Sequence, residues 1–299
     1  MAWLEESGYA HWRQRFEIER IVHRERTAWQ DLLIFESADL GRVLALDGII
    51  QLTERDAFIY HEMLCHVPLA AHGRARDVLI VGGGDGGTLE EALKHEGVAS
   101  VTVVELDPAV VASCRAHLPS VCRDAFDDPR ARVLFADGVR FVAETSQSFD
   151  AIIVDSTDEA GPGEVLFGEA FYADCSSRLR PGGVLVCQLG SCNPFAGLDL
   201  LARRLQRLAA AFADVGLFTA TVPTFIGGAY GFGFASDAPA RRRLDAQQLA
   251  ARPLPDGLRH YTPAVHAAAF VQPPWLAEAL AGACSGAVWR DPLQGRTPG

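Results

Sequence analysis

The spacing of apolar positions changes near residue 77, and this change separates two kinds of structure along the chain. Before it, residues 31–37 and 42–47 are short apolar runs rich in β-forming residues, and Asp47-Gly48 stands between two such runs. Asp-Gly favours a two-residue hairpin turn because glycine tolerates positive φ. A helical stretch follows at 55–66, and Pro68 is expected to end it. Residues 1–70 are therefore predicted to form a small antiparallel domain of β-strands and hairpins.

From residue 77 onward, apolar runs alternate with amphipathic stretches. The run at 77–83 is almost continuously apolar, as expected of a strand that is buried on both faces. The stretch at 198–212 has the clearest helical spacing. This alternation predicts βαβ units and a mostly parallel sheet, closed by an antiparallel edge at 218–223 and 230–236. We therefore predict an α/β fold, with a Rossmann-like domain over residues 71–299.

The composition is typical of a globular protein, and the charge and hydropathy of the chain argue against some classes of partner. Of the 299 residues, 49% are apolar and 22% are charged, so the chain can form a core. The net charge of −11 argues against a nucleic-acid partner, and the three arginines at 241–243 are expected to lie on a solvated loop edge. No apolar run is long enough to span a membrane and the N-terminus has no apolar signal core, so we expect a soluble, cytoplasmic protein without a membrane partner. The seven cysteines include no C-x-x-C pair, which favours buried, reduced thiols.

The sharpest local motif is the glycine-rich loop GGGDGG at 82–87, which lies between a buried strand and a helix. Glycines allow a tight turn and let a ligand approach the backbone closely. Gly82, Gly84 and Gly87 also satisfy G-x-G-x-x-G, and Glu105 ends the next strand at the distance of a ribose-binding acid. These features leave a nicotinamide dinucleotide and a sulfonium nucleoside open. Asp85 inside the loop favours the nucleoside, since its carboxylate would repel a pyrophosphate or the carboxylate of S-adenosylmethionine but attract an ammonium group.

Further acids follow the next strands. Asp137-Gly138 comes after the third strand of this domain, and Asp155 and Asp158 end the fourth. Because the carboxyl ends of parallel strands meet at one edge of the sheet, we expect four acids to converge on one rim, namely Asp85, Glu105, Asp137 and Asp155. Asp137 suits either the adenine amino group or the N-cap of the following helix. Asp155 and Asp158 predict a site for a cation.

A metal site is not expected. His61-Glu62 and His66 are similar to the zinc motif H-E-x-x-H but are one residue too far apart. Positions i and i+5 diverge on a helix, so the two histidines should not bind one ion. We therefore predict a chain without a bound metal.

Taken in order along the chain, these motifs resemble the polyamine aminopropyltransferases, the spermidine synthase family, and its bacterial members in particular. The resemblance covers nearly the whole chain. It rests on GGGDGG and the acids above, together with the segments at 29–31, 46–56, 58–63, 104–107, 127–130, 155–158, 222–224 and 261–266, and Gln188. It implies a small N-terminal β domain joined to a methyltransferase-like Rossmann domain, in a homodimer or homotetramer.

The resemblance also implies roles for individual residues. Decarboxylated S-adenosylmethionine, a co-substrate rather than a cofactor, would be bound by Gln30, Gln51, Gly82, Gly84, Asp85, Glu105, Asp137, Gly138 and Pro162. The amine pocket would comprise Tyr60, His61, Asp85, Asp155, Asp158, Gln188 and Phe225, with Trp12 as a further candidate. Within these sets Glu105 would bind the ribose, Asp137 the adenine and Asp85 the aminopropyl ammonium group. Asp155 would be the general base.

The implied reaction is attack by an amine of putrescine on the aminopropyl carbon next to sulfur, giving spermidine and methylthioadenosine. Three departures from the family pattern bear on the acceptor: Glu159 after Asp158, Phe225 after Thr224, and Leu189-Gly190-Ser191 after Gln188. They leave agmatine, cadaverine and spermidine open as acceptors. A methyltransferase, a nicotinamide dehydrogenase and a non-enzymatic polyamine-binding protein are the alternatives of other classes.

Overall fold

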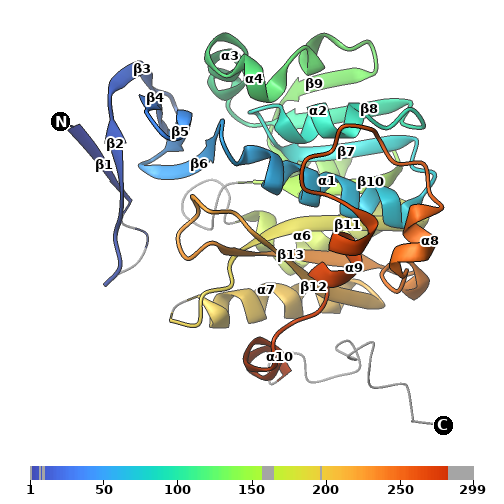
Figure 1. Ribbon diagram of the computed structural model, residues 1–299. Coiled ribbons are helices and arrows are strands. Elements are labelled where there is room, and N and C mark those ends of the chain that lie inside the picture. The colour runs from blue at the N-terminus through green and yellow to red at the C-terminus, as the bar shows by residue number, and fades with distance from the viewer. Residues whose placement is uncertain (1, 7, 9–10, 157–164, 196, 282–299) are drawn as a thin grey trace.

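The computed structural model describes residues 2–6, 8, 11–156, 165–195 and 197–281, which form two regions of β structure (Figure 1). The N-terminal region holds a two-stranded antiparallel sheet and a four-stranded antiparallel sheet of order β3-β4-β5-β6. Its strands are β1 (Ala2–Glu6), β2 (Gln14–Ile18), β3 (Arg20–Arg26), β4 (Asp31–Ser37), β5 (Gly41–Leu46) and β6 (Ile49–Thr53). Asp47 and Gly48 join β5 to β6 with φ of 48° and 81°, so the predicted hairpin turn is confirmed.

The second region is built on a seven-stranded sheet of order β12-β13-β11-β10-β7-β8-β9. Five of its strands run parallel, and β12 and β13 add the predicted antiparallel edge. The α/β fold class is therefore confirmed. The strands are β7 (Asp77–Gly82), β8 (Ser100–Glu105), β9 (Ala131–Phe135), β10 (Phe149–Asp155), β11 (Leu179–Ser191), β12 (Asp214–Thr221) and β13 (Ala229–Ser236).

Helices cover both faces of this sheet, as Figure 1 shows. Alternate residues of the central strands therefore enter two different cores: Ile80 and Ile153 contribute to one, and Val81 and Ile152 to the other. The helices are α1 (Ala57–His72), α2 (Gly87–Leu93), α3 (Pro108–His117), α4 (Pro119–Cys122), α5 (Gly138–Glu144), α6 (Glu169–Arg178), α7 (Leu198–Ala211), α8 (Ala246–Ala250), α9 (Pro263–Ala269) and α10 (Pro274–Ala281). No helix among the described residues has the length and apolar character needed to cross a bilayer.

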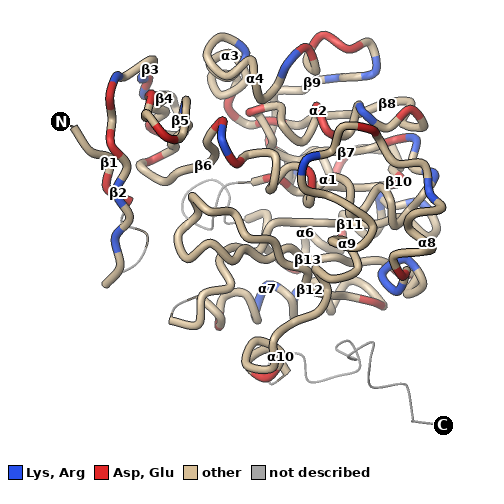
Figure 2. The backbone as a smooth tube through the Cα atoms, in the orientation of Figure 1, with Lys and Arg blue, Asp and Glu red and all other residues tan. Residues whose placement is uncertain are grey.

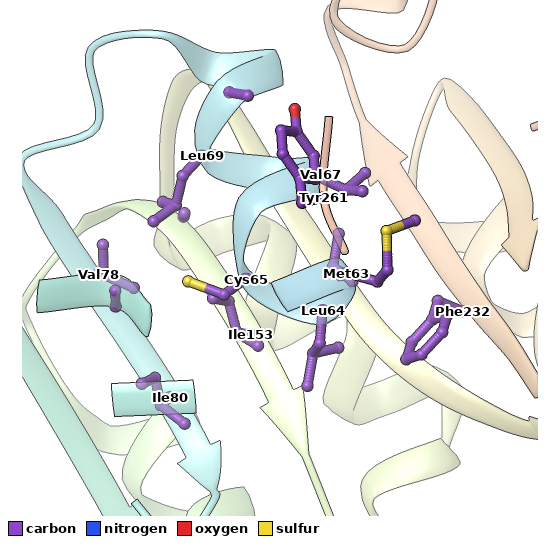
Figure 3. Close-up of a cluster of buried hydrophobic side chains, with 14 of the residues drawn as sticks. Met63, Leu64, Cys65, Val67, Leu69, Val78, Ile80, Ile153, Phe232 and Tyr261 are labelled. Atoms are coloured by element: carbon purple, nitrogen blue, oxygen red, sulfur yellow. The ribbon is translucent and has the colours of Figure 1, made fainter. Parts of the chain in front are cut away.

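Helix α1 is longer than the sequence predicts. Pro68 lies inside it, and the helix continues to His72. Gly73 follows with a φ of 77°, and its N–H donates to the Leu69 carbonyl of the last turn. Proline removes one backbone hydrogen bond, but nearly every side chain of α1 is buried. Figure 3 shows Met63, Leu64 and Val67 of this helix within the core cluster that it shares with the sheet. Packing therefore outweighs the local effect of proline.

Charged residues of both signs are interspersed along β1–β4 and around α3, and blue segments also gather near α8 (Figure 2). The prediction of a solvated loop edge at 241–243 is wrong for two of its three arginines. Arg241 donates to the carbonyls of Gly182 and His72, and Arg242 forms two 2.8 Å hydrogen bonds to buried Asp214. These guanidinium groups connect distant segments because their planar donors match carbonyl and carboxylate oxygens.

The prediction of buried, unpaired thiols is confirmed for the six described cysteines; Cys284 lies outside the described residues.

Candidate active site

A cavity of about 870 Å³ opens at the carboxyl ends of β7, β8 and β10, and the N-terminal β4–β6 region supplies part of its wall. It brings together most of the residues singled out in the sequence: Gln30, Gln51, Tyr60, His61, Gly82, Gly84, Asp85, Glu105, Asp137, Gly138, Asp155 and Phe225. The predicted convergence of four acids on one rim is therefore confirmed. Gln188 is fully buried and is not among the lining side chains. Asp158, Glu159 and Pro162 lie outside the described residues.

The glycine-rich loop brings the backbone close to two of the acids. A side chain at Gly82 would meet the Asp155 carbonyl at 2.1 Å, and one at Gly84 would meet Glu105 Oε2 at 2.8 Å. The Gly84 N–H donates to Glu105 Oε2 at 3.0 Å, and the Asp107 N–H donates to Oε1 at 2.9 Å. Burial nevertheless raises the pKa of Glu105 to about 7, against the opposite effect of these N–H groups. The absence of side chains thus lets the loop lie against Glu105, and both line the cavity.

Asp137 has the helix-capping role that its position allows. Its Oδ1 accepts from the N–H groups of Val139 (2.8 Å) and Arg140 (3.3 Å) at the start of α5. Two glutamines complete this side of the cavity. Gln30 Nε2 donates to Asp107 Oδ2 at 2.9 Å, and Gln51 Nε2 donates to the Ile49 carbonyl at 3.1 Å. The cavity wall here offers carboxylate and amide groups from both regions of the fold.

Asp155, at the end of β10, receives a hydroxyl donor on each carboxylate oxygen. Tyr60 of α1 donates to Oδ1 at 2.8 Å, and Thr88 of α2 donates to Oδ2 at 2.6 Å. Burial and the nearby Asp85 carboxylate raise the pKa of Asp155 to about 6, while His61 and the two hydroxyls act in the opposite direction. A carboxylate with such a pKa is ionised at neutral pH yet is a stronger base than an exposed aspartate.

Asp85 is paired with a histidine inside the same cavity. Its Oδ1 lies 3.2 Å from His61 Nε2 and accepts the Gly87 N–H at 2.7 Å. Burial disfavours the imidazolium form, but Asp85 outweighs it and raises the pKa of His61 to about 9, and the pKa of Asp85 is lowered in return. Single ligand atoms of His61, Asp85 and Asp155 lie within 4.8 Å of one another. With one imidazolium and two carboxylates, this cluster carries a net negative charge that suits an added ammonium group.

Aromatic rings form the wall beside this cluster. Tyr60 packs edge-on against Phe225 and Tyr230, with ring centroids 5.7 and 5.8 Å apart. The Tyr230 hydroxyl donates to Gln188 Oε1 at 2.7 Å, and Gln188 Nε2 donates to the Ser156 carbonyl at 3.1 Å. Gln188 therefore acts on the cavity through Tyr230 and the end of β10. Trp12 packs edge-on against Phe195 at 6.4 Å and is not among the lining residues described for the cavity.

The segment that carries Phe225 is tied to the start of α1. Buried Asp56 accepts both the N–H (2.9 Å) and the hydroxyl (2.7 Å) of Thr224, and Gln14 Nε2 donates to the Thr224 carbonyl at 2.8 Å. These bonds hold Phe225 against Tyr60. They also connect the β2 strand to the cavity wall.

The two histidines of the H-E-x-x-H-like segment contact different groups, as their spacing indicates. His61 faces Asp85, whereas His66 bonds to Glu91 and His95, each at 2.9 Å. Buried Glu62 between them accepts three backbone N–H groups at 259–261 and so anchors the C-terminal segment to α1.

The sequence did not identify two residues that contact this site. Tyr230 lies in the apolar β13 run, where aromatic residues alternate with glycines, so the pattern indicates only a core position. Thr88 follows the glycine loop, and 67 residues separate it from its partner Asp155. Neither carries a local signal, since both depend on contacts between distant segments.

Two family models match the chain. Residues 57–245 match a spermine/spermidine synthase domain, and residues 2–54 match a spermidine synthase tetramerisation domain. Over 270 residues the chain is 50% identical to a polyamine aminopropyltransferase of Escherichia fergusonii and 49% identical to one of Escherichia coli O157:H7. Each alignment covers 90% of this chain and 93% of the relative.

Solved structures give the same result. A spermidine synthase in complex with the transition-state analogue AdoDATO matches with a TM-score of 0.87 and 34% identity. A spermidine synthase from Thermotoga maritima matches with a TM-score of 0.84 and 33% identity. Both comparisons cover 93% of this chain and 94% of the other chain. The resemblance found in the sequence is therefore confirmed, and the chain belongs to the spermine/spermidine synthase family and is an aminopropyltransferase.

Proposed function

We propose that this protein transfers the aminopropyl group of decarboxylated S-adenosylmethionine to putrescine, releasing methylthioadenosine and forming spermidine. The observation that carries the proposal is the Asp155 carboxylate, buried and fixed by two hydroxyl donors beside Asp85 and His61 in one cavity. A positively charged amine and a positively charged sulfonium must meet in this reaction. A cavity with acidic groups along its rim favours both.

The nucleoside would occupy the side lined by the glycine loop. In this proposal Glu105 accepts hydrogen bonds from the ribose hydroxyls, Asp137 from the adenine amino group, and Asp85 pairs with the aminopropyl ammonium group. Occupation by hydroxyl donors would favour ionised Glu105, whose pKa burial raises to about 7. Asp85 would also repel the carboxylate of ordinary S-adenosylmethionine, and so select the decarboxylated donor.

The chemistry is a displacement at the carbon next to sulfur. Asp155 takes a proton from the bound ammonium group, which frees the nitrogen lone pair for attack. The new C–N bond forms as the C–S bond breaks, and the electrons of that bond remain on sulfur in neutral methylthioadenosine. Sulfonium is already a good leaving group, so holding nitrogen and carbon in line supplies much of the acceleration, up to about 7–11 kcal/mol in ideal cases. This chemistry requires neither a metal nor a redox cofactor.

Acceptor choice would depend on the aromatic wall. The Phe225 ring offers no hydroxyl where the family pattern commonly has tyrosine, so this wall suits the methylene chain of a diamine rather than an extra polar group. We further propose that the protein acts as a homodimer or homotetramer in the cytoplasm. The match of residues 2–54 to a tetramerisation domain and the buried, unpaired thiols support this.

The test is a mass-spectrometric assay of the purified protein with decarboxylated S-adenosylmethionine and putrescine, cadaverine, agmatine or spermidine. Methylthioadenosine and spermidine formed from putrescine are the expected products. Preferred reaction of another amine would keep the mechanism and change the acceptor. Methyl transfer from S-adenosylmethionine, or tight nucleoside binding without product from any amine, would overturn the proposal.

A further inference from the structure

Thr88 is a buried hydroxyl at the start of α2, immediately after the glycine loop. Its side chain is fully buried, and its Oγ1 donates to Asp155 Oδ2 at 2.6 Å. A distance this short is typical of a hydroxyl bonded to a charged carboxylate. Thr88 therefore contacts the proposed base without lining the cavity itself.

The orientation of this hydroxyl depends on its backbone. A threonine in a helix has few accessible χ1 rotamers, and its hydroxyl can instead bond a carbonyl in the preceding turn. Here the proton is directed across to β10. A hydroxyl has a single proton to donate, so bonding Asp155 Oδ2 commits it to that oxygen. Tyr60 does the same at Oδ1, and the two contacts fix the carboxylate plane while each oxygen keeps a lone pair for the amine.

We infer that Thr88 is a positioning residue for aminopropyl transfer: its hydroxyl holds Asp155 ionised and correctly oriented, and so sets the lower pH limit of activity. This inference rests on the function proposed above. Thr88 touches the base and not the amine, so its effect on the reaction passes through Asp155.

The balance of charges around Asp155 makes this hydrogen bond matter. Among the described residues, the titratable groups that act on the pKa of Asp155 are Tyr60 and His61 of α1 and Asp85 of the glycine loop, and Asp155 in turn contributes to the raised pKa of the buried Cys65 thiol of α1. Burial and Asp85 favour the protonated form, whereas His61 and the two hydroxyls favour the ionised form. Because these effects oppose one another near neutral pH, the loss of one donor shifts the population of ionised base in the range where the enzyme would work.

The experiment compares Thr88→Val, which keeps the shape and removes the donor, with Thr88→Ser, which restores the donor. Thr102→Val is the matched control, since Thr102 is a buried threonine of β8 away from the cavity lining. Aminopropyl transfer is measured from pH 5.5 to 9 at saturating donor and amine. In parallel, carbon-13 NMR of aspartate-labelled protein follows the Asp155 carboxyl, assigned by its absence in Asp155→Asn.

Loss of a hydrogen bond to a charged group should raise the pKa of Asp155 by about one unit. For Thr88→Val we expect the acid limb of the kcat–pH profile to move up by about one pH unit. At pH 5.5 its kcat should be nearly tenfold below that of the wild type, and at pH 9 the two kcat values should be equal. Thr88→Ser should retain the wild-type limb, and Thr102→Val should not move it.

Two results would overturn the inference: an unchanged Asp155 titration in Thr88→Val, or a loss of kcat that is equal at every pH and not restored by serine. If the wild-type protein transfers no aminopropyl group at all, the proposed function fails. The NMR titration would still decide whether Thr88 controls the ionisation of Asp155.

Discussion

Replacing Asp155 with asparagine should make the protein more stable while abolishing most of its activity. Asparagine has the same shape and stays neutral at every pH. Its amide oxygen can accept from one of the two hydroxyls, Tyr60 or Thr88, and its NH₂ group can donate to the oxygen of the other. The substitution therefore removes the charge of the base with little change in packing.

The magnitude follows from the pKa of the buried carboxyl. Folding raises the pKa of Asp155 from 3.8 to about 6, so the folded state binds this proton more tightly than the unfolded state. Stability from this group is therefore present below pH 3.8, is lost as the pH rises through 6, and stays lost above that. At about 1.4 kcal/mol per pKa unit, keeping Asp155 ionised at pH 8 costs up to about 3 kcal/mol. Asparagine avoids that cost.

The assay is urea unfolding of the wild type and Asp155→Asn at pH 8 and at pH 4.5, at one protein concentration. The variant should be more stable at pH 8, and the difference should shrink at pH 4.5. Asp39→Asn, at an exposed carboxylate, serves as the control and should change little. Turnover should fall by about 10²–10⁴-fold. A variant less stable than the wild type at pH 8 would refute the pKa argument, and near-normal turnover would remove Asp155 from the role of base.

Three further substitutions test other parts of the site. The pKa of His61 is raised from 6.5 to about 9, so its contribution to stability is complete below pH 6.5 and is lost as the pH rises through 9. His61→Gln should therefore lack this alkaline loss in urea unfolding. Gly84→Ala places a methyl group 2.8 Å from Glu105 Oε2, so calorimetric titration should show methylthioadenosine affinity reduced at least about tenfold with an unchanged circular dichroism spectrum. Phe225→Tyr adds a hydroxyl to the aromatic wall and should change the ratio of kcat/KM values between putrescine and agmatine by about 2–10-fold, the worth of one hydrogen bond; an unchanged ratio would show that this wall does not select the acceptor.

Features that depend on short stretches of backbone were predictable. The hairpin at Asp47-Gly48, the glycine loop between β7 and α2, and the antiparallel edge all follow from neighbouring residues. The acids at the strand ends were predictable for a related reason, since parallel strands place their carboxyl ends at one edge of the sheet. The family resemblance drew on the same ordered motifs.

Two predictions from the sequence were wrong because they depended on contacts between distant segments. Pro68 should have ended α1 by local rules, but the buried face of that helix against the sheet decided otherwise. Arg242 was expected in solvent, but the partner that buries it, Asp214, lies on β12. In both cases a contact from a distant segment outweighed the local preference.

The sequence by itself thus determined the α/β fold class and the order in which the glycine loop and the acids follow successive strands. It also determined the edge of the sheet at which those acids gather. These features follow from hydrophobic periodicity and local turn geometry. Only the tertiary structure decided the ionisation states there. Tyr60, 95 residues from Asp155, and Thr88, 67 residues from it, meet the carboxylate only after α1 and α2 have packed on the sheet. The pKa of that carboxyl depends on the water that this packing excludes and on the charges it brings near, and neither can be read from the order of residues.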